Sequence, residues 1–309
     1  MKVLVTGGTG VVGTGTVTEL VRRGHSVVLV SRHAKKDVAQ WPTGVTAYTA
    51  DVGNAAALHG AASGCDVVLH MVAVVEEEPP KVTFEQVNVE GTRHMLAEAA
   101  RAGVPRFVFV SSLGAPTGES GYHKSKAKAE QLVRGFDGTW TICRPGNVYG
   151  PGDEQISVLL RIVRGASPIV PKLGDGTQSF QPIWWEDAAR AISEIVERTD
   201  LAGHELDLAG RDVTCQNDLI ERLNVITGRE VSSIALPEFV ATLGAKAVSL
   251  VGWDVGFSDD QITMLREENV IPRGGTNGLT DVLGIEPTPL DTGLRKLCDL
   301  QPEQLPRDG

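Results

Sequence analysis

The stretch Val3-Leu-Val-Thr-Gly-Gly-Thr-Gly-Val-Val-Gly13 decides the fold. A short apolar segment over 3–6 runs directly into a glycine-rich turn, and a segment with helical periodicity over 11–23 follows. Strand, glycine turn and helix in this order are typical of the first unit of a dinucleotide-binding fold, in which the helix N-terminus offers N–H groups to a pyrophosphate. We expect the cofactor's phosphates to lie against Gly7, Thr9, Gly10, Val11, Val12 and Gly13.

The same alternation continues along the first half of the chain. Apolar, strand-like segments cover 26–30, 45–50, 66–70, 106–110 and 139–143. Helical periodicity covers 84–102 and 122–134, and a glycine follows each of these two segments. Short apolar strands that alternate with helices predict a parallel sheet with helices on both faces. The predicted fold class is therefore α/β, a doubly wound parallel sheet of the Rossmann type.

The rhythm changes after about residue 150. Loop-rich stretches appear there, and helical patterns cover 187–198, 216–227, 237–251 and 258–267. We expect a dinucleotide-binding Rossmann domain over 1–150 and a smaller, mainly helical substrate-binding region over 151–309. The boundary is soft because 178–183 could return a strand to the main sheet.

Composition narrows the range of partners. The 309 residues carry a formal net charge of −10, which disfavours binding to nucleic acid. The expected partner is a small-molecule substrate, bound by the region over 151–309. The four cysteines and seven histidines are scattered, so no metal site is expected. No uncharged apolar run reaches transmembrane length, and the strand that begins at Lys2 leaves no room for a signal peptide. These features predict a cytoplasmic protein, and they leave open whether it is a monomer or a homodimer.

The end of the second predicted strand selects the cofactor. An acid at this position would bind the 2′-hydroxyl of NAD, but the chain has Ser31 and Arg32, and no acid follows before Asp37. A hydroxyl followed by a guanidinium suits a 2′-phosphate. We therefore predict NADP(H), with NAD(H) as the alternative. Asp51, after the third strand, is either a turn cap or a contact for the adenine amino group, and the adjoining Val52 is expected at the cofactor too.

A second set of residues points to proton transfer. Tyr122 and Lys126 are four positions apart at the start of a helix and therefore share a face. A nearby ammonium and a cationic nicotinamide would lower the pKa of the phenol, so that Tyr122 could exchange a proton with a substrate oxygen. Ser111 and Ser112 end the fifth strand, at the sheet edge where such folds bind ligands, and either hydroxyl could bind that oxygen.

With these motifs the chain resembles the short-chain dehydrogenase/reductase superfamily. The resemblance covers about two-thirds of the chain. It rests on the glycine turn, Asn88-Val-Glu-Gly-Thr92, Phe107-Val-Phe-Val-Ser-Ser112, Tyr122-His-Lys-Ser-Lys126, Arg144-Pro-Gly-Asn-Val-Tyr-Gly-Pro151 and Gln181-Pro-Ile-Trp-Trp-Glu-Asp187. The last two stretches look like the extended or atypical branches, which include NAD-dependent epimerases and dehydratases. Leu283-Gly-Ile-Glu-Pro-Thr-Pro-Leu290 is similar to the dehydrogenase-like accessory subunit of respiratory complex I.

The resemblance implies a role for each matching residue. Tyr122 would be the general acid/base, Lys126 would bind the nicotinamide ribose, and Ser112 would polarise the substrate oxygen, with Ser111 as the second candidate. Ser112 precedes Tyr122 by ten positions, a shorter gap than is usual in the family. Asn88 would support the site. The nicotinamide side would be contacted by Met71, Val72, Ala73, Pro145, Asn147 and Val148.

Three functions agree with these features. The first is an NADP(H)-dependent oxidoreductase that transfers a hydride between nicotinamide and a carbonyl or alcohol substrate. The second is a sugar-nucleotide epimerase or dehydratase, in which the net redox change is zero. The third is a non-catalytic protein that binds NADPH as a structural subunit or sensor. Because such proteins often lose the tyrosine or the lysine, the presence of both Tyr122 and Lys126 favours an enzyme.

Overall fold

The computed structural model describes the whole chain except residues 40, 42, 237–258 and 301–309. The helix expected over 237–251 lies outside the described residues. Seven parallel strands form one sheet in the order β10-β6-β5-β4-β1-β2-β3. The strands are β1 (Lys2–Thr6), β2 (Ser26–Ser31), β3 (Val45–Thr49), β4 (Val67–His70), β5 (Arg106–Val110), β6 (Thr139–Pro145) and β10 (His204–Leu208). The prediction of a doubly wound parallel sheet is confirmed.

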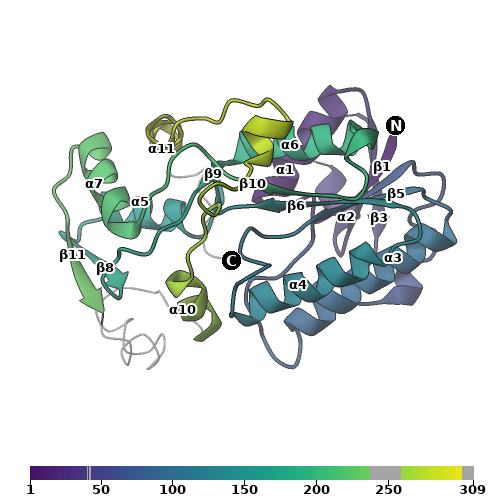
Figure 1. Ribbon diagram of the computed structural model, residues 1–309, viewed down its shortest axis with the longest axis horizontal. Helices are drawn as coiled ribbons and strands as arrows, with labels where there is room; N and C mark the ends of the chain where they lie inside the picture. Colours follow the sequence, from purple (N-terminus) through teal and green to yellow (C-terminus); the bar gives the residue numbers. More distant parts are fainter. Residues whose placement is uncertain (40, 42, 237–258, 301–309) are drawn as a thin grey trace.

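Helices cover both faces of this sheet (Figure 1). One face is covered by α1 (Val11–Arg22) and α6 (Trp185–Glu197), and the other by α3 (Gly91–Arg101) and α4 (Gly121–Arg134). The short α2 (Ala34–Val38) follows β2, η1 (Ala55–Leu58) follows β3, and the π-helical η2 (Glu85–Glu90) leads into α3.

Alternation within the strands explains the two layers. In β1, Val3 and Val5 belong to the core under α1 and α6, whereas Leu4 belongs to the core under α3 and α4. In β5 the aromatic Phe107 and Phe109 face the second of these cores. Successive side chains of a strand point to opposite faces, so strands buried on both sides are apolar throughout.

A second, smaller part of the molecule has its own core. Its helices are α5 (Ile156–Arg164), α7 (Gln216–Thr227) and α11 (Leu290–Asp299), which pack together through buried leucines such as Leu160, Leu223 and Leu294 (Figure 1). Parallel pairs of short strands lie beside them, β8 (Ile169–Leu173) with β11 (Ser232–Leu236) and β7 (Val148–Tyr149) with β9 (Ile183–Trp184). The other elements in the described part of the chain are α10 (Asp259–Arg266), η3 (Thr199–Leu201) and η5 (Gly278–Val282).

The strand that returns to the main sheet is not the one considered from the sequence. The stretch 178–183 stays outside that sheet, and its last residue, Ile183, pairs with Val148 of β7. Instead β10 lies beside β6, with Leu206 opposite Cys143. The domain boundary near residue 150 stays a prediction. Two elements that follow residue 150 belong to the first layered part of the molecule, because α6 covers the main sheet and β10 is one of its strands. No helix among the described residues is long and apolar enough to cross a membrane.

Candidate active site

The glycine turn between β1 and α1 is tightly packed. Gly7 has a φ of +70°, and a Cβ there would lie 2.6 Å from the backbone N of Val72. A Cβ on Gly13 would lie 2.0 Å from the backbone O of Gly7. On Gly10, by contrast, a Cβ would meet only the O of Gly7, at 3.8 Å. The fold therefore requires glycine at positions 7 and 13, and it leaves open space in front of Gly10.

The N-terminus of α1 faces this open space. Gly10 is its N-cap residue, and no side chain caps the helix there. The first N–H groups of a helix have no intrahelical partners and carry partial positive charge, so they attract anions. The exposed Thr9 and the half-buried Val11 and Val12 border the turn. These residues fit the diphosphate of a dinucleotide.

The end of β2 carries charges of both signs. Arg32 is exposed, as expected for a group that could bind a phosphate. The hydroxyl of Ser31 donates a hydrogen bond to the carboxylate of Asp37, and the backbone N of His33 donates to the same hydroxyl oxygen at 3.2 Å. The helix α2 thus brings an acid back to the strand end, although it stands six positions away in the sequence.

Asp51 and Val52 have separate structural tasks after β3. Oδ1 of Asp51 accepts a hydrogen bond from the backbone N of Gly53 at 2.8 Å, which is the turn cap considered above. The carboxylate is exposed, and its contact with adenine stays a prediction. Val52 is buried against the helix start at Gly91, where a Cβ would lie 2.9 Å from its Cγ2.

A buried histidine fixes the backbone behind the glycine turn. Nδ1 of His70 lies 2.8 Å from Oγ1 of Thr6, and its Nε2 lies 3.1 Å from Oγ1 of Thr92. The hydroxyl of Thr92 donates to the backbone O of Asn88 at 2.7 Å, so it accepts from Nε2–H of His70, and Nδ1 accepts from Thr6. Burial, aided by the charge of Lys126, lowers the pKa of His70 to about 3, so its ring is neutral.

Asn88 ties the segment after β4 to α4. Its amide accepts from the backbone N of Val74 at 2.8 Å and donates to the O of the same residue at 3.0 Å. The amide also donates to Oγ of Ser125 at 2.9 Å, and that hydroxyl donates to the backbone O of Tyr122 at 2.6 Å. The three residues expected on the nicotinamide side, Met71, Val72 and Ala73, are half-buried in this segment.

Tyr122 and Ser112 lie together at the carboxyl end of β5. A hydrogen bond with the Ser112 side chain lowers the pKa of Tyr122, but burial outweighs it and raises that pKa to about 12. Removal of the phenol from water disfavours its charged form, and the lowering expected with the cationic nicotinamide bound stays a prediction. At neutral pH Tyr122 carries its proton.

Lys126 lies one helical turn beyond Tyr122 and is buried. Its Nζ donates to the backbone O of Val110 at 2.8 Å and lies 4.3 Å from the centre of the Phe109 ring. Burial lowers the pKa of Lys126 to about 8, and the charge of Glu130 opposes this shift. The ammonium form is therefore still the main one at neutral pH.

Ser111 is engaged elsewhere, in a buried ionic network. Its hydroxyl donates to Oε1 of Glu130 at 2.6 Å. Arg144 donates to both oxygens of that carboxylate, at 2.7 and 2.6 Å, and to Glu205 of β10 at 2.5 Å. We did not single out Glu130 from the sequence, although it lies two helical turns beyond Tyr122 and so shares its face.

The turn after β6 lies next to a segment from far along the chain. Pro145 ends β6 and is buried, and Val148 begins β7. Oδ1 of Asn147 accepts from Nδ2 of Asn269 at 2.6 Å, while its Nδ2 donates to Oε1 of Gln155 at 2.8 Å. No sequence pattern marks Asn269, because the contact joins residues 122 positions apart.

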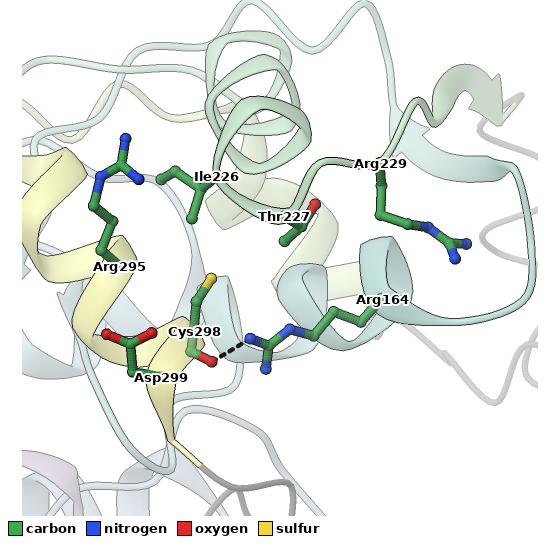
Figure 2. A pocket seen from close by; sticks show the side chains of 7 residues that line it. All are labelled: Arg164, Ile226, Thr227, Arg229, Arg295, Cys298 and Asp299. Atoms are coloured by element: carbon green, nitrogen blue, oxygen red, sulfur yellow. Dashed lines mark hydrogen bonds between the residues drawn. The ribbon is translucent and has the colours of Figure 1, made fainter.

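A pocket of about 450 Å³ lies in the smaller part of the molecule (Figure 2). It is lined by the ends of α5, α7 and α11, which close with Arg164, Thr227 and Asp299. Figure 2 shows the guanidinium groups of Arg164, Arg229 and Arg295 pointing in different directions, and Arg164 donates to the backbone O of Cys298. Arg229 likewise donates to the backbone O of Gly165, so two of the three guanidinium groups are engaged by carbonyl groups at the helix ends. No group of three or more metal-ligating side chains occurs among the described residues.

Comparisons with known proteins agree with the geometry. The sequence profile of the NAD dependent epimerase/dehydratase family matches residues 3–209. The ceramide reductase of Caulobacter vibrioides is 31% identical over 245 residues, 79% of this chain and 76% of that protein. The 2-alkyl-3-oxoalkanoate reductase of Stenotrophomonas maltophilia is 31% identical over 215 residues, 62% of this chain and 64% of that protein.

Solved structures agree with the fold. MoeE5, solved in complex with UDP-glucose and NAD, superimposes with a TM-score of 0.72 at 24% identity, over 96% of this chain and 97% of that chain. The resemblance to the extended branch of the short-chain dehydrogenase/reductase superfamily is thereby confirmed. The further likeness to the complex I subunit stays a prediction.

Proposed function

We propose, because the chain belongs to the NAD dependent epimerase/dehydratase family, that it is an NADP(H)-dependent oxidoreductase that interconverts a carbonyl compound and an alcohol. The family and its reductase relatives support an NAD(P)-dependent enzyme of the oxidoreductase type. When bound, the nicotinamide supplies or accepts the hydride. The protein binds and orients the cofactor and the substrate, and its side chains transfer the proton.

One observation carries this proposal. The side chain of Ser112 lies near enough to the phenol of Tyr122, at the carboxyl end of β5, to lower its pKa, and the buried Lys126 follows one helical turn later. In open α/β sheets, ligands bind at the carboxyl ends of the strands. The glycine turn around Gly10 lies at the same edge of the sheet, after β1. The residues proposed to bind the cofactor and those proposed to transfer the proton therefore follow strands that end at one edge of the sheet.

The proton chemistry follows from the state of each group. Tyr122 is protonated at neutral pH because burial raises its pKa to about 12, so in reduction it donates a proton to the substrate oxygen. Ser112 hydrogen-bonds to that oxygen and keeps it near the phenol. Lys126 stabilises the phenolate that remains and binds the nicotinamide ribose. Asn88 holds Ser125, and through it the backbone of Tyr122.

The end of β2 supports NADP(H) and also contains the main argument against it. The exposed Arg32 suits a 2′-phosphate, whereas the carboxylate of Asp37 would repel one. Because the Ser31 hydroxyl already donates to Asp37, that carboxylate is turned toward the strand, and we assign the phosphate contact to Arg32. Asp51, Val52 and the turn around Gly10 would bind the rest of the dinucleotide.

The relatives suggest where to look for the substrate. One is named as a reductase of ceramide and the other as a reductase of a 2-alkyl-3-oxoalkanoate, and we propose a lipid-like ketone, or its alcohol, as the substrate class. We further propose that the protein acts on this small molecule in the cytoplasm, as a monomer or a homodimer.

A sugar-nucleotide epimerase or dehydratase is the second candidate. The carboxylate of Asp37 at the end of β2 favours it, because an acid in this region can bind the 2′-hydroxyl of NAD. Such an enzyme would keep NAD bound and show no net oxidation or reduction.

Titration of the purified protein with NADPH and NADH at one salt concentration tests the proposal, followed by a screen of ketones and alcohols with the better cofactor. Tight NADPH binding and turnover of a ketone support it. Preference for NADH, or NAD retained through purification, supports the epimerase or dehydratase. NADPH binding without turnover supports the non-catalytic alternative, and binding of neither cofactor contradicts all three.

A further inference from the structure

Two carboxylates near α10 contact the first turn of α4, the helix that carries Tyr122. Asp260 lies within α10, and Glu267 follows the last residue of that helix. Two helical turns separate positions 260 and 267, so both side chains leave the same side of the segment. Figure 1 shows α10 beside one end of α4.

Asp260 binds the backbone at Tyr122 itself. Its Oδ1 accepts from the backbone N of Gly121 at 2.5 Å, and its Oδ2 accepts from the backbone N of Tyr122 at 3.1 Å. A Cβ on Gly121 would lie 3.1 Å from Oδ1 of Asp260 and equally close to the ring of Phe84. Glycine at position 121 therefore permits the close approach of the two elements.

Glu267 binds backbone N–H groups just before α4 and a side chain within its first turn. Its Oε1 accepts from the backbone N of Glu119 at 2.5 Å and from that of Ser120 at 2.7 Å. Its Oε2 is hydrogen-bonded to Nδ1 of His123, whose side chain is 5% exposed. Burial alone would raise the pKa of Glu267, but hydrogen bonds from Ser120, Glu119 and His123 hold it below its usual value. Glu267 is therefore ionised at neutral pH.

The helix itself provides only part of the cap that its first turn requires. Oγ of Ser120 accepts from the backbone N of His123 at 3.2 Å. The N–H groups of Gly121 and Tyr122 receive their acceptor from Asp260, which stands 139 and 138 positions away in the sequence. A helix leaves about four N–H groups without intrahelical partners at its start. A distant segment therefore binds the turn on which the orientation of Tyr122 depends.

The same segment has a second anchor, in the turn after β6. Nδ2 of Asn269 donates to Oδ1 of Asn147, in the turn after β6, at 2.6 Å. The backbone N of Gln181 donates to the O of Asn269 at 2.9 Å. Residues 260–269 therefore run from the start of α4 to the turn after β6, and they have a fixed contact at each end.

We propose that Asp260 and Glu267 are positioning residues, which orient Tyr122 by binding the first turn of α4. The inference rests on the proposed function in so far as Tyr122 transfers the proton there. The alternative is an ordinary helix cap, since carboxylates at a helix N-terminus stabilise it wherever they come from. A cap alone would change stability and leave the reaction rate as it is.

Substitutions at the two positions separate these interpretations. Asp260→Ala removes both acceptors, Asp260→Asn keeps one, and Glu267→Gln removes the charge but keeps an acceptor oxygen. Glu268→Gln is the matched control, because the neighbouring Glu268 is exposed and the change is chemically the same. Should Asp260→Ala fail to fold, Asp260→Asn and Glu267→Gln still test the proposal.

The readouts are the position of Tyr122 and the reaction rate. The chain has three tyrosines, so protein labelled with ¹³C at the tyrosine Cζ gives three NMR signals, and loss of one in Tyr122→Phe assigns it. We expect the Tyr122 signal to shift or broaden in the variants at 260 and 267, while those of Tyr48 and Tyr149 stay unchanged. We expect kcat to fall about ten- to a hundredfold in Asp260→Ala and less in Asp260→Asn, with a smaller change in KM.

Each outcome has one meaning. An unchanged Tyr122 signal in all three variants would overturn the proposal whatever the activity. A shifted Tyr122 signal with unchanged kcat would mean that the two carboxylates cap the helix and have no positioning role. An equal effect of Glu268→Gln would mean that the change in surface charge, and not the contact with α4, causes the result. A shifted signal in a protein that turns over no substrate would support the contact and contradict the proposed function.

Discussion

The hydroxyl of Ser111 donates a 2.6 Å hydrogen bond to Oε1 of Glu130, and both residues are buried. This bond distinguishes two adjacent serines that the sequence left as alternatives. Ser111 faces the ionic network of Arg144, whereas the side chain of the neighbouring Ser112 lies near enough to the phenol of Tyr122 to lower its pKa. Because side chains of successive residues point to opposite sides, only one of them can face the substrate.

Alanine substitutions at the two serines should affect different properties, stability at position 111 and kcat at position 112. Ser111→Ala removes one hydrogen bond from the buried Glu130, so the free energy of unfolding should fall by about 1–3 kcal/mol. Ser112→Ala should leave stability nearly unchanged and lower kcat by about a hundredfold, because the substrate oxygen loses a donor. Urea unfolding and steady-state kinetics of both variants measure this, and the reverse pattern would exchange the two assignments.

Tyr122→Phe should lower turnover by about 10²–10⁴-fold, since the proton donor is lost while the ring remains. The affinity for NADPH should stay the same, because the phenol acts on the substrate oxygen. Tyr48→Phe is the control, as the Tyr48 hydroxyl donates only to the backbone O of His59, at 2.8 Å. Turnover by Tyr122→Phe at the wild-type rate would rule out the catalytic role.

Arg32→Ala should weaken NADPH binding roughly ten- to a hundredfold and NADH binding little, because one charge-assisted contact with the 2′-phosphate is lost. Asp37→Asn should strengthen NADPH binding relative to NADH by removing a like charge. Lys35→Ala is the control, because it removes one positive charge, as Arg32→Ala does, from an exposed residue of α2. It therefore separates a direct contact with the 2′-phosphate from long-range electrostatic attraction. Equal losses for NADPH and NADH in Arg32→Ala would contradict the phosphate contact.

His70 should make stability depend on pH. Its pKa is about 3 in the folded chain and 6.5 ordinarily, so below pH 6.5 the unfolded chain binds a proton that the folded chain does not. Stability from this group is complete above pH 6.5 and declines by about 1.4 kcal/mol per pH unit as the pH falls toward 3. His70→Gln should be less stable at pH 8 yet lose less between pH 6.5 and 5.

Chemical unfolding across this pH range, with the exposed His59→Gln as control, provides the measurement. Wild type and His59→Gln should give parallel curves, and His70→Gln should give a flatter one. Three parallel curves would mean that His70 is protonated in the folded chain, against the hydrogen-bond pattern with Thr6 and Thr92.

The parts of the site that could be predicted from the sequence depend on local contacts. The glycine turn joins one strand to the next helix, and Tyr122 and Lys126 are one turn apart on α4, so spacing alone relates them. The parts that could not be predicted are made by distant residues. Asp260 and Glu267 reach α4 from more than 130 positions away, and nothing near them in the sequence marks that contact.

Two further differences between the sequence-based predictions and the structure have other causes. β10 was not predicted, because its polar residues, such as Glu205 and Asp207, interrupt the apolar pattern of the other strands. They face Arg144 at an edge of the sheet, where one side of the strand can be charged. The raised pKa of Tyr122 depends on burial, which no spacing of motifs reveals.

The position of β1 inside the sheet, between β4 and β2, has a consequence for folding on the ribosome. This strand is synthesised before the other six, yet one of its two neighbours is β4, which ends at His70, and the sheet is complete only with β10, which ends at Leu208. Domains form as units while the chain emerges from its N-terminus. The nascent chain must therefore hold one edge of β1 unpaired until β4 has been synthesised, and one edge of β6 unpaired until β10 has been synthesised, and these open edges can be bound by chaperones.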